Sequence, residues 1–203
     1  VIFDLYYLTP SAENHSARAL YEANCFGVIR QLHFSAQRPN DSIDVVTFIN
    51  GLPIATFELK NHYTGQTVEH AVNQYKTDRD PKEVLLRPKR CAVHFAVDDT
   101  DVKMCTALAG KDSWFLPFNR GYQGGAGNPP IPGKTMTSYL WEAILTKSSL
   151  SNIIEHFAKV IEVKDKQGKT KERVIWPRYH QLDAVRHLIA ETASAPVGRK
   201  FLV

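Results

Sequence analysis

The stretch from Ser42 to Asn61 decides the fold, and it reads SIDVVTFINGLPIATFELKN. Two runs rich in β-branched and aromatic residues flank Asn50-Gly51, and this dipeptide between such runs is a strong signal of a β-hairpin. Each run also carries a carboxylate, Asp44 in the first and Glu58 in the second, and Lys60 follows closely. Charged residues are rarely buried in strands unless they are paired, so these three need an explanation beyond stability.

The length of the turn decides whether the two carboxylates can act together, because directly opposed residues of antiparallel strands project from the same face. A two-residue loop, Asn50-Gly51, would set Asp44 against Phe57 and send the carboxylates to opposite faces. A three-residue loop that also includes Leu52 sets Asp44 opposite Glu58, with Cβ atoms about 4.5 to 5.5 Å apart. We expect the three-residue loop, because Gly51 can supply the left-handed position that it needs.

Two carboxylates this close repel each other, so one must be protonated, pair with a cation or bind a metal. Ligands that are all oxygen, with positions open to water, favour Mg²⁺ over zinc. Lys60 points to the same face, where its charge could orient a water molecule or stabilise a pentacovalent phosphorus. The arrangement suits phosphodiester hydrolysis. The alternative is that the three residues are polar edge-strand positions or a salt bridge.

The first part of the chain predicts an α/β fold in which a mixed central β-sheet is flanked by helices. Apolar residues at helical spacing predict an amphipathic helix from Thr67 to Asp78. A continuous apolar run predicts a strand covered on both faces from Cys91 to Val97. The other elements expected here are a helix at Ala12–Asn24, a strand at Phe26–Phe34 and an antiparallel strand at Asp101–Leu108.

The composition changes in the second part of the chain, and we expect a domain boundary near residue 148. The first domain then spans residues 1–148, and residues 149–203 form a connecting helix, a hairpin and the start of another domain. Gly and Pro predict an irregular loop from Gly121 to Gly133. The elements expected after it are helices at Ser138–Thr146 and Ser149–Ile161, a charged hairpin at Glu162–Arg173 and a helix at Trp176–Ile189.

Composition excludes several classes of protein. The 203 residues are 43% hydrophobic, which suits a globular core, and no apolar run approaches the roughly 20 residues that span a bilayer. Three scattered cysteines argue against a disulfide framework or a structural zinc site and fit a reducing cytoplasm. The net charge is +4, and both ends of the chain look cut from something longer. Two basic clusters are candidate phosphate-binding surfaces: Lys76, Arg79, Lys82, Arg87, Lys89 and Arg90, and Lys164, Lys166, Lys169, Lys171 and Arg173.

A resemblance to known nucleases sharpens this interpretation. Asp44, a hairpin turn, Glu58-Leu59-Lys60 and a following helix resemble the PD-(D/E)xK nuclease core, although no Pro precedes Asp44. A wider set of segments, spread over nearly the whole chain, resembles the R subunit of type I restriction enzymes. These segments are Ser42-Ile43-Asp44, Asn50-Gly51-Leu52-Pro53, Glu58-Leu59-Lys60-Asn61, Thr64-Gly65-Gln66-Thr67, Gln74-Tyr75, Asp78-Arg79-Asp80-Pro81, Val93-His94-Phe95-Ala96-Val97 and Gly124-Gly125-Ala126-Gly127-Asn128-Pro129.

The resemblance implies roles for individual residues. Asp44 and Glu58 would bind the catalytic Mg²⁺, or Mn²⁺ as a substitute, helped by the Leu59 carbonyl, and Lys60 would be catalytic. Similar nucleases carry a Gln-x-x-x-Tyr motif, from which Gln74 can be carried over as a supporting catalytic residue. The expected tyrosine position holds Asp78 instead, and Tyr75 falls on the apolar face of its helix. An acidic residue of the preceding helix completes some such sites, and Glu22 is the candidate here.

R subunits also contain a superfamily 2 translocase after the nuclease. Trp176 and Gln181 resemble residues that contact adenine just before its ATP-binding loop, so ATP is implied for the full-length subunit but not for this fragment. In the first basic cluster, the residues expected to contact the DNA backbone are Lys76, Arg79 and Lys82.

The expected function is therefore that of a Mg²⁺-dependent endonuclease domain acting on duplex DNA. In the family, a specificity subunit recognises the site, a methyltransferase subunit scaffolds the complex, and ATP-driven translocation precedes cleavage at distant positions. Two alternatives stay open: a stand-alone repair or junction nuclease with the same core, and a non-catalytic DNA-binding or docking module.

Overall fold

The computed structural model describes residues 4–164, 168–194 and 198. In this part of the chain, six strands form one sheet in the order β1-β2-β3-β4-β5-β6. Neighbouring strands are antiparallel except β3 and β4, which are parallel. The strands are β1 (Phe26–His33), β2 (Ser42–Ile49), β3 (Leu52–Leu59), β4 (Val93–Val97), β5 (Val102–Cys105) and β6 (Leu116–Pro117).

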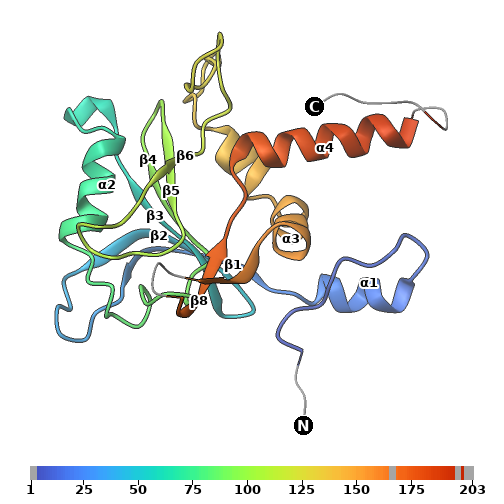
Figure 1. Ribbon diagram of the computed structural model, residues 1–203, viewed down its shortest axis with the longest axis horizontal. Coiled ribbons are helices and arrows are strands. Elements are labelled where there is room, and N and C mark those ends of the chain that lie inside the picture. The colour runs from blue at the N-terminus through green and yellow to red at the C-terminus, as the bar shows by residue number, and fades with distance from the viewer. Residues whose placement is uncertain (1–3, 165–167, 195–197, 199–203) are drawn as a thin grey trace.

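Helices flank this sheet (Figure 1). The helices are α1 (His15–Glu22), α2 (Val68–Thr77), α3 (Lys147–His156) and α4 (Tyr179–Ser194), with a 3₁₀ turn η1 (His62–Thr64) and a π-helical turn η2 (Leu140–Ile144). A separate hairpin pairs β7 (Lys159–Lys164) with β8 (Thr170–Ile175). This mixed sheet with flanking helices confirms the expected α/β class. No helix of the described residues is long and apolar enough to cross a membrane.

The parallel pair β3–β4 organises the sheet, because parallel neighbours need a crossover connection. Here η1 and α2 supply part of that connection, and α2 packs on one face of the sheet while α3 and α4 lie on the other (Figure 1). All five residues of β4 are buried, as expected for a strand covered on both faces. The α2 helix buries Val68, Ala71, Val72 and Tyr75, the four apolar positions that the sequence predicts.

The larger core lies between the sheet and the C-terminal elements. Phe57 of β3 and Phe95 of β4 stack with ring centroids 5.2 Å apart. Leu150 of α3 and Leu182 of α4 belong to the same buried cluster. Side chains from both sides of residue 148 therefore share one core, and the boundary expected there stays a prediction.

Three predicted elements differ in the structure. The helix expected through Ile161 ends at His156, because the Phe157 and Ala158 amides both donate to the Ile153 carbonyl and the β-branched residues that follow pair in β7. The helix expected at 138–146 is only the π-helical turn η2. The last helix begins at Tyr179, after Pro177, and extends past Ile189 to Ser194.

The hairpin sets Asp44 opposite Glu58, as expected, but its turn is shorter than predicted and is followed by a β-bulge. The turn has two residues, Asn50 at φ 50° and Gly51 at φ 81°, so the predicted three-residue loop was wrong. A β-bulge then shifts the register: Phe48 pairs with Pro53, whereas Thr47 pairs with Ala55.

The extra residue of the bulge, Ile54, restores the alignment that the shorter turn would have lost. Beyond it Val45 pairs with Phe57, and continuing this register by one residue sets Asp44 opposite Glu58. The bulge sits beside Pro53, where a missing N–H makes an irregular ladder easier to accommodate.

The turn yields a first prediction. Gly51→Ala should lower the free energy of unfolding by about 1 to 2 kcal/mol, because a Cβ disfavours the left-handed conformation even where space is open. Gly127→Ala is the matched control: Gly127 has equally open surroundings and no positive φ, so the change should stay within about 0.5 kcal/mol. Urea unfolding of the two variants measures the difference, and equal effects would contradict the role of the turn.

Candidate active site

Asp44 lies near the start of β2 and is held by two hydrogen bonds. Its Oδ2 accepts from the Leu59 amide at 2.8 Å, and its Oδ1 accepts from Nε2 of Gln31 at 2.9 Å. Ser42 in turn donates to Oε1 of Gln31 at 2.8 Å. The carboxylate is partly exposed and points at the end of β3, so both its position and its orientation are fixed by neighbouring strands.

Glu58 is the more unusual carboxylate, because it is completely buried. Its Oε1 accepts from Nε of Arg79 at 2.6 Å. Burial raises the pKa of Glu58 to about 7, against the opposing effect of Arg79, while the nearby charge of Asp44 raises it further and that of Lys60 lowers it. Glu58 therefore takes up a proton near neutral pH unless a second cation approaches.

Lys60 directly follows the last residue of β3, and its backbone still pairs with β4. Its backbone amide donates to the Val97 carbonyl at 2.8 Å, which continues the pairing of β3 with β4. The side chain is half-buried, and its charge is close enough to Glu58 to affect the pKa of that carboxyl. The structure thus brings Asp44, Glu58 and Lys60 together at one end of the hairpin.

The polar atoms around these residues fit a hard divalent cation. Among the described side chains, four buried nitrogen or oxygen atoms lack a hydrogen-bond partner, and two of them belong to predicted catalytic residues: Oε2 of Glu58 and Oε1 of Gln74. The hydrogen bond from the Leu59 backbone amide to Asp44 also holds the backbone at the end of β3 against that carboxylate. Carboxylate, amide and carbonyl oxygens suit Mg²⁺ or Mn²⁺.

A zinc-type cluster is not found in the part of the chain that the structure describes, where no three His, Cys, Asp or Glu side chains are arranged so that they could hold a metal ion. Glu22 therefore does not join the two acids as a third carboxylate. It makes an exposed ion pair with Lys147 instead, at 2.7 Å. The expectation for Glu22 is not supported.

Tyr75 serves the core. It is fully buried in α2, and its hydroxyl contacts Oγ1 of Thr56 at 2.8 Å. The same Thr56 oxygen lies 2.7 Å from Nδ1 of His94. Burial lowers the pKa of His94 to about 3, so the imidazole is neutral, and the three groups form a satisfied polar link between α2, β3 and β4.

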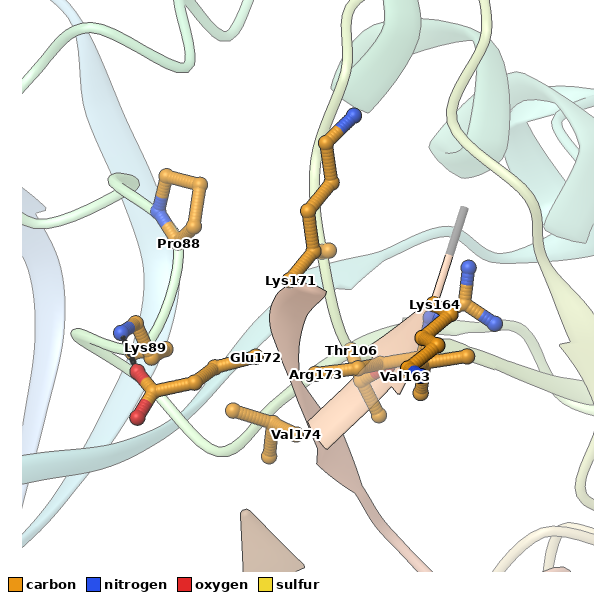
Figure 2. Close-up of a pocket in the computed structure, with 10 residues that line it drawn as sticks. Pro88, Lys89, Thr106, Val163, Lys164, Lys171, Glu172, Arg173 and Val174 are labelled. Carbon is orange, nitrogen blue, oxygen red and sulfur yellow. Dashed lines mark hydrogen bonds and ion pairs between the residues drawn. The ribbon is translucent and has the colours of Figure 1, made fainter. Parts of the chain in front are cut away.

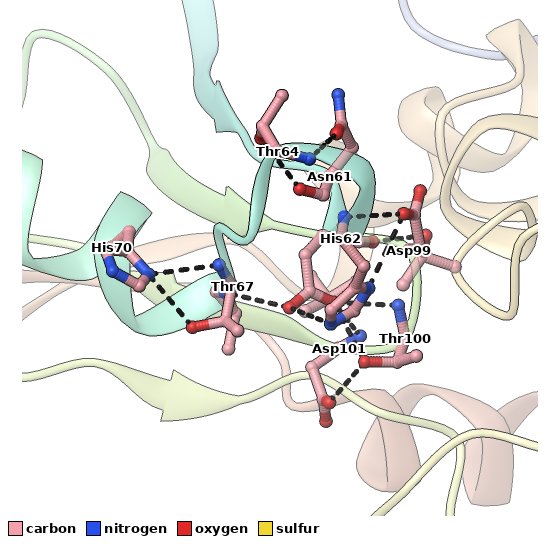
Figure 3. A network of polar contacts seen from close by, with 12 residues as sticks. Asn61, His62, Thr64, Thr67, His70, Asp99, Thr100 and Asp101 are labelled. Carbon is pink, nitrogen blue, oxygen red and sulfur yellow. Dashed lines mark hydrogen bonds and ion pairs between the residues drawn. The ribbon is translucent and has the colours of Figure 1, made fainter.

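A polar network fixes the segment after Lys60 (Figure 3). Oδ1 of Asn61 accepts from the Thr64 amide at 3.1 Å and caps η1. The His62 ring lies between two carboxylates, with Nε2 3.7 Å from Asp98 and Nδ1 3.5 Å from Asp99. Asp98 also accepts from the Val68 amide at 2.6 Å, at the start of α2. The network ties the end of β3 to the beginning of α2.

The two residues expected to contact adenine have different surroundings. Trp176 is buried in the main core, where its ring meets Phe95 edge to face at 6.3 Å, and it also lines a cavity together with Gln181. Gln181 is exposed, and its Oε1 accepts from the Arg178 amide at 3.1 Å, next to the first residue of α4. Adenine contacts by Trp176 and Gln181 stay predictions.

The residues expected to bind DNA differ in how exposed their charges are. Lys76 is half-buried and Lys82 is exposed, whereas the guanidinium of Arg79 is buried against Glu58. Arg79 therefore does not offer its charge at the surface. Its pairing with Glu58 is the part of the site that sequence spacing alone missed.

Described residues of the two basic clusters lie close together in space. Lys89 of the first cluster forms an ion pair with Glu172, which stands between Lys171 and Arg173 of the second (Figure 2). A cavity of about 310 Å³ lies there, lined by Pro88, Lys89, Thr106, Ala107, Val163, Lys164, Lys171, Glu172, Arg173 and Val174. Lys89 also lines a pocket with Leu52 and Ile54, near the start of β3, whereas Glu58 lies near its end. The cavity is therefore separate from the acidic pair. Lys166, assigned to the second cluster, lies outside the described residues.

The core role of Tyr75 gives a second prediction. Tyr75→Phe removes the hydroxyl that contacts Thr56 and should lower the free energy of unfolding by about 0.5 to 1.5 kcal/mol. Mg²⁺ affinity should be unchanged, since the ring still fills the core. Urea unfolding and calorimetric titration of the same preparation measure the two quantities, and a selective loss of Mg²⁺ binding would show that the hydroxyl belongs to the site.

Comparison with known proteins adds a family to this geometry. The model of the family described as "Type I restriction enzyme R protein N terminus" matches residues 13–113. The matched region contains α1, the strands β1 to β5, α2 and all four predicted catalytic residues, Asp44, Glu58, Lys60 and Gln74. A search of curated proteins found no match. Residues 13–113 of this chain therefore match the N-terminal region of type I restriction enzyme R proteins.

Proposed function

We propose that this chain is the endonuclease domain of a type I restriction enzyme R subunit, and that it hydrolyses phosphodiesters of duplex DNA with Mg²⁺. The observation that carries the proposal is the acidic pair at the end of the hairpin, where the register sets Asp44 opposite Glu58 and Oε2 of Glu58 has no partner. The order of elements gives further support: a hairpin, a helix and a parallel strand are what a PD-(D/E)xK core would require.

Each residue has a distinct role in this proposal. Asp44 and Glu58 would hold the ion, with the Leu59 carbonyl as a further ligand, and Gln74 would support the site through its amide oxygen. When bound, Mg²⁺ supplies charge that polarises the phosphodiester and lowers the pKa of a coordinated water. Lys60 would orient the attacking water or stabilise the negative charge that develops on the phosphate.

The family suggests how the domain works in a larger assembly. In the full complex, cleavage would be coupled to ATP-driven translocation and would occur away from the recognition site. The methyltransferase and specificity subunits would be its protein partners. Lys76 and Lys82 would contact the DNA backbone, and contacts of this kind position a duplex without reading its sequence.

One observation favours a second candidate, a DNA-binding or docking module without catalysis. Arg79 already neutralises Glu58, so the carboxylate has a structural partner even without a metal. A stand-alone nuclease with the same core differs from the first proposal only in its partners. Metal binding separates the catalytic candidates from the non-catalytic one.

The third prediction tests the proposed function directly. Asp44→Ala and Glu58→Ala should each abolish calorimetric Mg²⁺ binding, because each removes one of the two carboxylates. Lys60→Ala should retain binding but lower nicking of plasmid DNA by about 100-fold or more, as is typical when a group that stabilises developing charge is removed. Asp41→Ala is the matched control, since Asp41 pairs with Arg38 and not with a proposed site residue, and its loss should change neither quantity.

Nicking is expected from the isolated domain with Mg²⁺ or Mn²⁺, and metal binding without nicking would mean that cleavage needs the other parts of the complex. Absence of metal binding in the unsubstituted protein would contradict the proposal and favour the non-catalytic module.

The raised pKa of Glu58 gives a fourth prediction. Below a pKa of about 7 the carboxyl is protonated, so an ion must displace the proton, and its apparent affinity should fall as the pH falls. The loss should approach about tenfold per pH unit below pH 7 and level off above pH 8. Calorimetric Mg²⁺ titrations at pH 6, 7 and 8 measure it, and equal affinity at all three values would show that Glu58 does not compete for a proton.

A further inference from the structure

Arg79 is an unusual neighbour for a metal ligand. Its side chain is 7% exposed and the Glu58 side chain is 0% exposed, so the ion pair between them is almost completely removed from water. Such a pair gives little net stability relative to apolar residues of similar size, because both charges must be desolvated. A buried arginine at this position therefore calls for a role beyond packing.

Three contacts fix the guanidinium. Nε donates to Oε1 of Glu58 at 2.6 Å, and Nη2 donates to the Ser42 carbonyl at 2.8 Å. The planar group also lies over the Phe34 ring, 5.7 Å from its centroid. Ser42 is two residues before Asp44, so one guanidinium bonds to the backbone beside the first acid and to the side chain of the second.

This geometry distinguishes the two oxygens of Glu58. Arg79 binds Oε1, whereas Oε2 is buried without a hydrogen-bond partner. A carboxylate held at one oxygen by a rigid donor cannot rotate freely, and its other oxygen keeps one direction. The planar fork of arginine suits this task because its donors are fixed relative to each other, which the single ammonium of lysine cannot reproduce.

We infer that Arg79 is a positioning residue of the metal site: it binds Oε1 of Glu58 and the Ser42 carbonyl, and so presents Oε2 of Glu58 to the divalent ion. This inference rests on the proposed function. It assigns to Arg79 a role in orienting a ligand rather than in contacting DNA. The opposite arrangement, in which the guanidinium competes with the ion for Glu58, predicts the opposite change in affinity.

The test compares Mg²⁺ binding by calorimetry at pH 8 in the unsubstituted protein, Arg79→Gln, Arg79→Lys and Arg87→Gln. Arg79→Gln should weaken binding by about tenfold or more, the range typical for groups that orient a metal ligand. Arg79→Lys should recover part of the loss, because it restores the charge but not both hydrogen bonds. Arg87→Gln is the matched control, since Arg87 is exposed and donates to the Lys82 carbonyl, and its affinity should be unchanged.

Circular dichroism and thermal unfolding establish that each variant is folded. Unchanged or tighter Mg²⁺ binding in folded Arg79→Gln would overturn the inference while leaving the proposed function intact. If Arg79→Gln does not fold, Arg79→Lys decides: weaker binding supports positioning, and equal binding overturns it. Failure of both variants to fold would make Arg79 a structural residue and also overturn the inference. Absence of binding in the unsubstituted protein would instead remove the proposed function, and the inference with it.

Discussion

The register between β2 and β3 is the constraint on which the candidate site depends. Side chains alternate between the two faces of a strand, so a slip of one residue would move Glu58 away from Asp44. The two-residue turn by itself gives the wrong alignment, and the bulge at Ile54 corrects it before the strands reach the acidic pair. The turn and the bulge therefore set the register together, and neither alone explains why the carboxylates face each other.

The sheet around the hairpin fixes the pair in three dimensions. The parallel strand β4 continues the pairing beyond β3 through the bond from the Lys60 amide to Val97, while Asp98, just after β4, binds the start of α2. The helix is thereby held at both ends: Asp98 caps its beginning, and Arg79, two residues past its end, reaches Glu58. The crossover required by parallel strands thus also delivers the cation that neutralises the buried acid.

Much of this arrangement could be predicted from the sequence, and the exceptions have physical causes. Alternation and helical spacing were sufficient for the hairpin, α2 and β4, because those patterns record burial directly. The helix expected through Ile161 was wrong because Val160 and Ile161 continue an apolar pattern that fits a strand as well as a helix. The predicted length of the turn was wrong because the spacing of residues in a sequence gives no clear signal of a β-bulge. Arg79 was assigned to a basic surface because charge in a sequence does not show which side chain turns inward.

The buried charge of Glu58 opposes stability, so other parts of the fold must offset it. Desolvation alone would favour the neutral acid, whereas the bond to Arg79 favours the ionised form, and the result is a group balanced near neutral pH. The polar link of Thr56, Tyr75 and His94 lies beside it without adding charge, since His94 is kept neutral by burial. The Glu58–Arg79 ion pair is therefore packed beside hydrogen-bonded groups that add no charge of their own. In such surroundings a divalent cation at Oε2 would meet little competition from neighbouring donors, which makes the unpartnered oxygen, rather than the number of acids, the feature that best defines the site.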